Sequence, residues 1–234
     1  DGVEVLKGIT TTFETGKVNL VIGQSGSGKT VFLKSLLNVF EPTSGHILFD
    51  GRDIVGMSRQ EKEALRAEIG TVFQGSALFD SMTVQDNIMF PLDMFTNLTF
   101  TEKKKRVKEV IGRVHLENAE KKFPSEISGG MQKRVSLARA ICTDPQIIFF
   151  DEPTTGLDPI MANVINDLII KIREELGATT IAITHDMNSV RRIAKEVVLI
   201  HNGKIQWFEF VQISIYFHVM IYASYLCNSK LLFF

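Results

Sequence analysis

A short apolar run, a glycine-rich segment and a helix-like segment follow one another near the start of the chain. Residues 17–22 are rich in β-branched side chains and stop at Gly23, which is typical of a buried strand. Residues 23–30 read Gly-Gln-Ser-Gly-Ser-Gly-Lys-Thr and match the pattern G-x-x-x-x-G-K-[ST] in full. Apolar residues then recur at helical spacing over residues 30–39. This order predicts a polyphosphate-binding loop between a strand and a helix.

Each residue type in this loop has a physical task. Glycines let successive backbone N–H groups point inward at an anion, and the following helix presents its positive dipole end. We expect Lys29 to reach the β- and γ-phosphates and the Thr30 hydroxyl to bind Mg²⁺. The alternative is a plain glycine- and serine-rich turn, and the strand and helix on either side argue against it. The residues of this loop predicted to bind the phosphates of a nucleotide are Gly23, Gln24, Ser25, Gly26, Ser27, Gly28, Lys29 and Thr30.

Two carboxylates follow a second apolar run at residues 147–150. Asp151 is expected at the carboxyl end of a buried strand, where ligands bind in open α/β sheets, and there it can hold the Mg²⁺ that Thr30 also binds. Glu152 is placed to polarise a water for in-line attack on the γ-phosphate. Alone, such a pair indicates an ordinary strand-end turn, but together with the phosphate loop it indicates a catalytic site.

The second half of the chain alternates strand and helix patterns. Near-continuous apolar strands between helices predict a parallel sheet covered by helices. Residues 84–123 are richer in helix signals, including a helix over 102–116 that Thr101 precedes. The basic run at 103–106 is read as a solvated helix face rather than a patch for an acidic partner.

Charge and length exclude several classes of protein. The 234 residues carry 26 basic and 27 acidic side chains, and a net charge of −1 argues against a nucleic-acid partner. This length suits one large domain or one domain with a subdomain. The 2 cysteines cannot build a disulfide framework, which favours a reducing compartment.

Further segments, taken with the loop and the carboxylates, resemble the ATP-binding subunits of ABC transporters. Residues 127–131, Ile-Ser-Gly-Gly-Met, resemble the signature motif usually written Leu-Ser-Gly-Gly-Gln. Residues 151–158 resemble a Walker B motif that runs into a D-loop. Gln74 resembles the Q-loop glutamine, and His185 resembles the switch histidine. These motifs keep the family's order and cover residues 1–207.

The resemblance implies a fold and a set of roles. The fold is α/β, a P-loop NTPase of the ABC nucleotide-binding type with a β-rich N-terminal edge and a helical subdomain at about 84–145. The activity is a Mg²⁺-dependent ATPase coupled to transport, working as a homodimer in which each signature motif binds the partner's ATP. The implied roles are catalysis by Glu152 as base, His185 as switch and Gln74; metal binding by Thr30, Gln74 and Asp151; in-trans contact by Ser128, Gly129 and Gly130; and a D-loop role for Asp158.

A narrower resemblance is carried by residues 73–84 and 87–92, which resemble the ATPase of the Mla phospholipid transport system. It implies hydrophobic cargo moved between the membranes of a double-membraned bacterium, with an MCE-type substrate-binding partner. It also implies a peripheral position on the cytoplasmic face of the inner membrane, with a permease subunit docking near residues 74–92. Phe79, Met82 and Met89 are read either as that docking surface or as subdomain core.

Three departures from the family pattern bear on this interpretation. No aromatic residue lies in residues 1–12, so the adenine-stacking residue is expected upstream of Asp1. Met131 stands where the signature usually has glutamine. The pattern stops after Trp207, and residues 208–234 form an atypical apolar tail. Residues 210–229 are 20 residues without Asp, Glu, Lys or Arg; a frameshifted or foreign C-terminus is favoured over a membrane-spanning segment.

Two other functions stay open. One is a soluble ABC ATPase of translation or DNA repair, which would need tandem cassettes or a long coiled-coil insertion that 234 residues do not hold. The other is a truncated or frameshifted product that keeps the motifs but does not hydrolyse ATP. The sequence leaves the cargo, the direction of transport and the identity of the permease undetermined.

Overall fold

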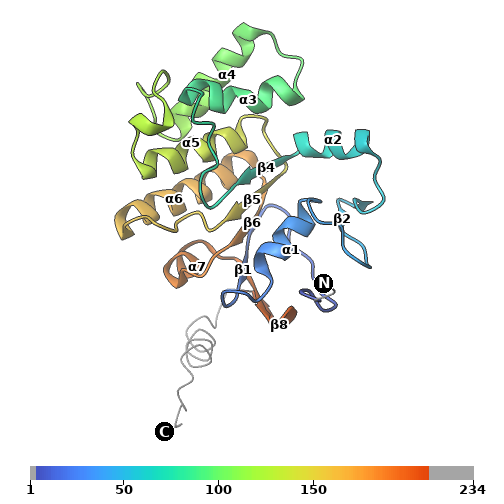
Figure 1. Ribbon diagram of the computed structural model, residues 1–234. Helices are drawn as coiled ribbons and strands as arrows, with labels where there is room; N and C mark the ends of the chain where they lie inside the picture. Colours follow the sequence, from blue (N-terminus) through green and yellow to red (C-terminus); the bar gives the residue numbers. More distant parts are fainter. Residues whose placement is uncertain (1–3, 211–234) are drawn as a thin grey trace.

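The computed structural model describes residues 4–210, and a six-stranded sheet runs through them (Figure 1). Its order is β4-β5-β6-β1-β7-β8, and a second, two-stranded sheet pairs β2 with β3. All neighbouring strands of the main sheet are parallel except the last pair, β7 and β8, which are antiparallel. The strands are β1 (Val18–Ile22), β2 (Leu48–Phe49), β3 (Arg52–Asp53), β4 (Ile69–Val72), β5 (Ile147–Asp151), β6 (Thr179–Ile183), β7 (Glu196–His201) and β8 (Lys204–Phe210).

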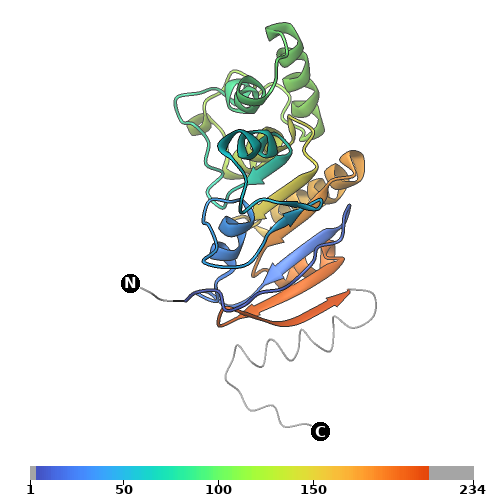
Figure 2. The same cartoon turned by 90° about the vertical axis from the view of Figure 1, so that its right-hand side faces the viewer.

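The helices cover the sheet and extend beyond one of its edges. They are α1 (Lys29–Leu36), α2 (Arg59–Ala67), α3 (Val84–Phe95), α4 (Phe100–Arg113), α5 (Gly129–Ile141), α6 (Pro159–Leu176) and α7 (Met187–Ile193), with the 3₁₀ turn η1 (Pro124–Glu126) before α5. Helices α3 and α4 lie beyond the β4 edge, at the opposite end from β8 (Figures 1 and 2). The predicted β–α alternation therefore produces a layered domain with a helical extension.

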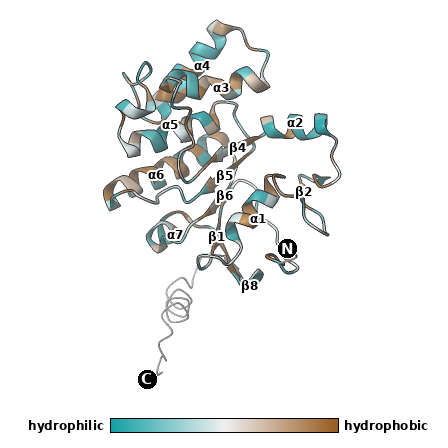
Figure 3. Ribbon diagram, viewed as in Figure 1, coloured by the Kyte–Doolittle hydropathy of each residue, from teal (hydrophilic) through white to brown (hydrophobic). Residues whose placement is uncertain are grey.

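Strand residues alternate between two apolar clusters, one on each face of the sheet. In β5, Ile148 and Phe150 join the cluster that includes α5, α6 and α7, whereas Ile147 and Phe149 join the one that includes α1. Both faces of a parallel strand must therefore be apolar, which explains the continuous apolar runs in the sequence. Figure 3 shows the central strands as largely hydrophobic and α2 as largely hydrophilic, and α2 buries only Leu65.

Two of the predicted helices have wrong boundaries. The first helix ends at Leu36 rather than near residue 39, because Asn38 adopts a left-handed conformation with φ 53°. Helix α4 begins at Phe100 rather than after Thr101, and it ends at Arg113 rather than at residue 116. Its N-cap is Thr99, whose hydroxyl accepts the Glu102 N–H while the Glu102 carboxylate accepts the Thr99 N–H. This capping box satisfies two backbone donors at once and fixes the start of the helix.

The β-rich N-terminal edge is smaller than predicted. Residues 4–17 form no strand, and between residues 4 and 68 the only strands besides β1 are the two-residue strands β2 and β3. The Lys7 N–H donates to the Gly203 carbonyl at 2.7 Å. Leu6, Ile9 and Phe13 pack against the cluster that includes α1. The segment is therefore held mainly by its side chains rather than by a ladder of hydrogen bonds.

The predicted domain division stays a prediction, namely an ATPase domain at 1–207 with a helical subdomain at about 84–145 and a tail at 208–234. Helices α3, α4 and α5 lie within that predicted subdomain. The tail from residue 211 onward, with its frameshift and membrane-segment interpretations, lies outside the described residues. Among residues 4–210, none of the helices combines the length and apolar character needed to cross a bilayer.

Candidate nucleotide-binding site

The predicted site residues follow four neighbouring parallel strands. The register places Val72 opposite Phe150, Asp151 opposite Ile183, and Ile183 opposite Val21. The carboxyl ends of β4, β5, β6 and β1 therefore meet at one edge of the sheet, which is where open α/β sheets bind ligands. The structure brings together at this edge Gln74, Asp151, Glu152, His185 and the glycine-rich loop at 23–30.

The glycine-rich loop is packed where it leaves β1 and open at its centre. A Cβ at Gly23 would lie 2.2 Å from the Ile200 carbonyl oxygen, so only glycine fits there. Gly28, which precedes α1, has φ 107°, a conformation that other residues rarely adopt. The Ser27 hydroxyl is buried and has no hydrogen-bond partner among the described residues. This unpaired donor beside the start of a helix fits a phosphate ligand.

Lys29 folds back over this loop. Its ammonium donates to the Gly23 carbonyl at 2.7 Å and to the Gln24 carbonyl at 2.9 Å. Burial lowers the pKa of Lys29, while the carboxylates of Glu152 and Asp151 act in the opposite direction. The cation therefore sits among the loop carbonyls and within electrostatic reach of the two carboxylates. Thr30, the second residue of α1, is exposed.

Glu152 is fixed by its backbone and by two side-chain contacts. It has φ 51°, and its N–H donates to the Ile183 carbonyl at 3.0 Å. Its Oε1 lies 2.8 Å from Nδ1 of His185, and its Oε2 accepts the Thr155 hydroxyl at 3.1 Å. A left-handed conformation at a non-glycine residue is strained and is often found at functional sites. The contacts orient both carboxylate oxygens.

The donor set next to Glu152 suits Mg²⁺. Burial raises the pKa of Asp151, and the neighbouring charge of Glu152 raises it further. A bound cation would therefore stabilise the ionised carboxylate of Asp151. The Thr30 hydroxyl, the Asp151 carboxylate and the Gln74 amide supply the hard oxygen ligands that Mg²⁺ prefers. No group of three or more His, Cys, Asp or Glu in the described part of the chain could hold a metal.

The signature and D-loop residues cap helices. The Ser128 hydroxyl accepts the Met131 N–H at 3.3 Å at the start of α5. Gly130 packs against α6, since a Cβ there would lie 2.8 Å from Cε of Met161. Asp158 accepts the N–H groups of Ile160 and Met161, each at 3.0 Å, and so caps α6. None of these residues belongs to the group at the strand ends, and their in-trans and D-loop roles remain predictions.

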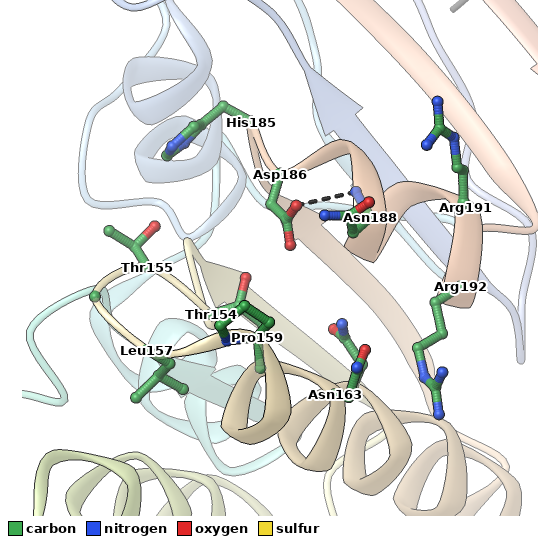
Figure 4. A pocket seen from close by; sticks show the side chains of 13 residues that line it. Thr154, Thr155, Leu157, Pro159, Asn163, His185, Asp186, Asn188, Arg191 and Arg192 are labelled. Atoms are coloured by element: carbon green, nitrogen blue, oxygen red, sulfur yellow. Dashed lines mark hydrogen bonds between the residues drawn. The ribbon is translucent and has the colours of Figure 1, made fainter.

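A cavity of about 590 Å³ extends from the D-loop segment along α6 and α7 (Figure 4). Thr155 and His185 lie at one end of it, and Arg192 lies at the other. The Arg192 guanidinium is bound to Asp167, with its shortest contact at 2.6 Å. The cavity therefore opens beside the groups that hold the Glu152 carboxylate.

Sequence reasoning missed a buried polar network behind this cavity. The Ser189 hydroxyl donates to Asp186 at 2.6 Å and accepts the Asn166 amide at 2.9 Å. It also lies 3.3 Å from the Thr154 hydroxyl. The network ties the segment after Glu152 to the helix after His185. No motif marks Ser189, and its signal is only a polar residue on the buried side of α7.

Three further side chains hold the loop after β4 and were also missed. Lys133 and Arg139 on α5 donate to its carbonyls. The buried Asn87 amide accepts the Phe79 N–H at 2.8 Å and donates to the Phe79, Met82 and Thr83 carbonyls. One signal for Asn87 was available in the sequence: it is a polar residue at a helical position where the apolar pattern predicts a core residue.

The segment at 79–89 is interpreted either as a docking surface for the permease or as subdomain core, and the structure gives different answers for different residues. Met89 is buried in the core, so it is not part of an exposed docking surface. Phe79 is exposed, and its ring lies 4.8 Å from that of Phe90. The basic run is a partly paired face, since Lys103 binds Asp93 at 2.8 Å.

Comparison with known proteins identifies the family. A family model described as "ABC transporter" matches residues 6–155. The probable ribonucleotide transport ATP-binding protein mkl of Mycobacterium tuberculosis is 44% identical over 185 residues, covering 79% of this chain and 52% of that protein. The methionine import ATP-binding protein MetN of Corynebacterium diphtheriae is 39% identical over 203 residues, covering 87% of this chain and 59% of that protein. The chain thus spans between half and three fifths of the length of these relatives.

Solved structures agree with this result. The ATP-binding cassette MJ0796, described as a dimer in a post-hydrolysis state bound to ADP and Pi, is 30% identical, with a TM-score of 0.82 and coverage of 89% of this chain and 91% of that one. The protein cbiO1 of Clostridium perfringens, part of the transporter complex cbiONQ, is 31% identical, with a TM-score of 0.84 and coverage of 95% and 88%. The predicted fold class is confirmed. The chain belongs to the ABC transporter family and has the fold of its ATP-binding, P-loop NTPase domain.

Proposed function

We propose that the chain hydrolyses Mg²⁺-bound ATP as the ATPase subunit of an ABC transporter. The observation that carries this proposal is the 2.8 Å contact between Glu152 Oε1 and His185 Nδ1, at the ends of β5 and β6. The contact lies beside the loop that holds Lys29, whose ammonium is within electrostatic reach of Glu152. A carboxylate that takes a proton from water and an imidazole near the γ-phosphate are the groups that in-line attack needs.

Each residue at the strand ends has a proposed task. Lys29 and the N–H groups of residues 23–30 bind the phosphates. Thr30, Asp151 and Gln74 hold Mg²⁺, which when bound neutralises charge on the phosphate oxygens. Glu152 orients the attacking water and accepts its proton, and Thr155 holds the second carboxylate oxygen in place.

The proposed active form is a head-to-tail homodimer. The N-terminus of α5 offers backbone N–H groups and a positive dipole end, and Ser128, Gly129 and Gly130 would present them to the partner's ATP. Asp158 would lie at the same interface. The similarity to MJ0796, which is described as a dimer with ADP and Pi, supports this arrangement.

We place the permease contact near residues 74–92, on the loop after β4 and on α3. Phe79, at 39% exposure, is the apolar side chain of that segment available for docking. This contact would hold the chain peripherally at the cytoplasmic face of the inner membrane. An MCE-type substrate-binding partner completes the proposed assembly.

The proposed substrate is hydrophobic cargo of the phospholipid type. This proposal rests on the resemblance of residues 73–84 and 87–92 to the ATPase of the Mla system. The names of the relatives point to two competing cargoes, a ribonucleotide and methionine. With the permease complex in detergent micelles free of lipid, we expect added phospholipid to stimulate the ATPase and the other two compounds not to. Stimulation by methionine or a ribonucleotide alone would replace the cargo and leave the ATPase assignment standing.

The catalytic assignment is tested by the Glu152→Gln variant. The amide cannot accept a proton, so we expect phosphate release to fall at least about a hundredfold, within the range for general-base catalysis. Binding of a fluorescent ATP analogue should stay within about twofold, because the phosphate contacts are unchanged. Glu63→Gln, at an exposed position on α2, is the matched control and should hydrolyse ATP like the unchanged chain.

The outcomes separate the rival functions. Near-normal turnover in Glu152→Gln would contradict the role of that residue. Absence of hydrolysis in the unchanged chain, with ATP still bound, would favour the non-hydrolysing product. Activity stimulated by ribosomes or DNA rather than by a permease would favour the soluble ATPase of translation or DNA repair.

A further inference from the structure

The loop after β4 contains two consecutive residues in a left-handed conformation, and neither is glycine. Ser76 has φ 62° and Ala77 has φ 49°. Side chains with a Cβ seldom adopt this conformation, and two in a row persist only where the surroundings hold them. Gln74, the proposed metal and water contact, lies two residues before Ser76. The structure around this loop therefore decides where Gln74 is placed.

Arg139 on α5 holds the two left-handed residues. Its guanidinium donates to the Ser76 carbonyl at 2.9 Å and to the Ala77 carbonyl at 2.8 Å. The same guanidinium lies 5.9 Å from the centre of the Phe79 ring. A planar group with several donors is suited to bind two carbonyls at once.

Lys133 on the same helix binds the backbone of Gln74, the proposed metal and water contact. Its ammonium donates to the backbone carbonyl of Gln74. The side chain is 7% exposed, and its charge interacts with Asp151 and Glu152. One buried cation therefore joins three parts of the site, namely helix α5, the loop after β4 and the carboxylate pair at the end of β5.

We propose that Lys133 and Arg139 form a clamp that positions Gln74. Both are positioning residues, since they bind the loop backbone and not the reacting atoms. Helix α5 begins at the signature residues 128–130, so the clamp ties the loop to the helix that would contact the partner's nucleotide. A displacement of α5 then moves Gln74 toward or away from the metal site. This inference rests on the proposed ATPase function and adds a mechanical link within it.

The first test measures the loop without nucleotide. Hydrogen exchange of peptides covering residues 73–79 is compared among the unchanged chain, Lys133→Met, Arg139→Met and Arg134→Met. We expect the first two variants to exchange at least about tenfold faster in this segment, because the loop opens locally once the clamp is cut. Arg134 is the matched control, since it lies on the same helix and donates to the Val114 and His115 carbonyls instead. Its substitution should leave residues 73–79 unchanged.

The second test measures ATP hydrolysis with the same variants. Lys133→Met should lower kcat about tenfold with KM for ATP within about twofold, because Gln74 is misplaced while the phosphate contacts stay intact. Lys133→Arg, which can still donate to the Gln74 carbonyl, should restore most of kcat. In Arg139→Lys the lysine offers fewer donors in a fixed geometry than arginine does. Residues 73–79 should therefore exchange at a rate between those of the unchanged chain and Arg139→Met.

Several results would overturn the clamp. Unchanged exchange at 73–79 in folded Lys133→Met and Arg139→Met would do so, as would equal effects in Arg134→Met. If the methionine variants do not fold, the conservative variants Lys133→Arg and Arg139→Lys decide. Faster hydrogen exchange at residues 73–79 in Lys133→Arg than in the unchanged chain would contradict the proposal. Absence of hydrolysis in the unchanged chain would sink the proposed function instead, while the exchange experiment would still judge the clamp.

Discussion

Glu152 shows how backbone strain and side-chain contacts combine at one position. A left-handed residue at the end of β5 turns the chain sharply, and the contacts to His185 and Thr155 then fix the carboxylate. The residue before it, Asp151, continues the strand register opposite Ile183. The two adjacent carboxylates thus have different surroundings, which suits the separate tasks proposed for them, metal binding by Asp151 and orientation of water by Glu152.

Cys142 provides a prediction about chemical reactivity. It is 2% exposed, and burial raises the pKa of its thiol to about 12. In a Cys227→Ser variant at pH 8, we expect Ellman's reagent to label the native protein at least about a hundredfold more slowly than the urea-unfolded protein, because only the thiolate reacts. The same shift implies that folding stability falls as pH rises above about 8.5, since the unfolded thiol ionises first.

The control for this labelling is the Cys142→Ser, Cys227→Ser double variant, which should not react. Equal labelling rates in the native and unfolded states would contradict the burial of Cys142.

Helix α4 provides a prediction about a helix boundary. The capping box of Thr99 and Glu102 fixes its start, so Thr99→Ala should lower the free energy of unfolding by about 1 kcal/mol. Thr101 lies inside the helix at an exposed position. Thr101→Ala should therefore leave the free energy of unfolding unchanged or raise it slightly, because alanine has the higher helix propensity. Urea denaturation followed by circular dichroism measures both. A larger loss in Thr101→Ala than in Thr99→Ala would place the start of the helix elsewhere.

The parts of the fold and site that were predictable are those that depend on local chemistry. The phosphate loop, the strand before it and the acidic pair after β5 each follow from contiguous residues. Lys133, Arg139 and Asn87 could not be predicted, because their role depends on how α5 and α3 are turned against the loop after β4. Ser76 and Ala77 gave no turn signal, since tertiary contacts rather than glycine impose their conformation.

The α4 boundary was mispredicted for a different reason. Two threonines, at positions 99 and 101, compete as caps, and only Thr99 has an acidic residue three positions later in Glu102. Helix α2 starts with the same device, a capping box of Ser58 and Glu61, and the same pattern in the sequence selects Thr99 as the cap of α4.

For the assembled molecule we predict ATP-dependent dimerisation. A single chain has a mass of 26.3 kDa, and the Glu152→Gln variant with Mg²⁺ and ATP should elute at about twice that mass, since blocked hydrolysis retains the nucleotide between two chains. Adding Ser128→Glu should abolish the dimer while each chain still binds ATP, because a carboxylate there repels the partner's phosphates. Size-exclusion chromatography with light scattering measures both.

Ser58→Glu is the matched substitution, because Ser58 caps α2 as Ser128 caps α5. It should leave dimerisation unchanged. Persistence of the dimer in the Ser128→Glu variant would contradict the head-to-tail arrangement.

The position of β1 in the sheet has a consequence for biosynthesis. This strand is made long before β6 and β7, which are its neighbours in the sheet, with Val18 opposite Thr180 and Leu20 opposite Val197. The ribosome must therefore deliver almost the entire ATPase domain before β1 can pair on either side. Until then its apolar residues and both its hydrogen-bonding edges are open to chaperones and to other nascent chains. Messages interrupted before the codons for β6 would yield chains whose phosphate loop is intact in sequence but whose β1 lacks both of its partner strands.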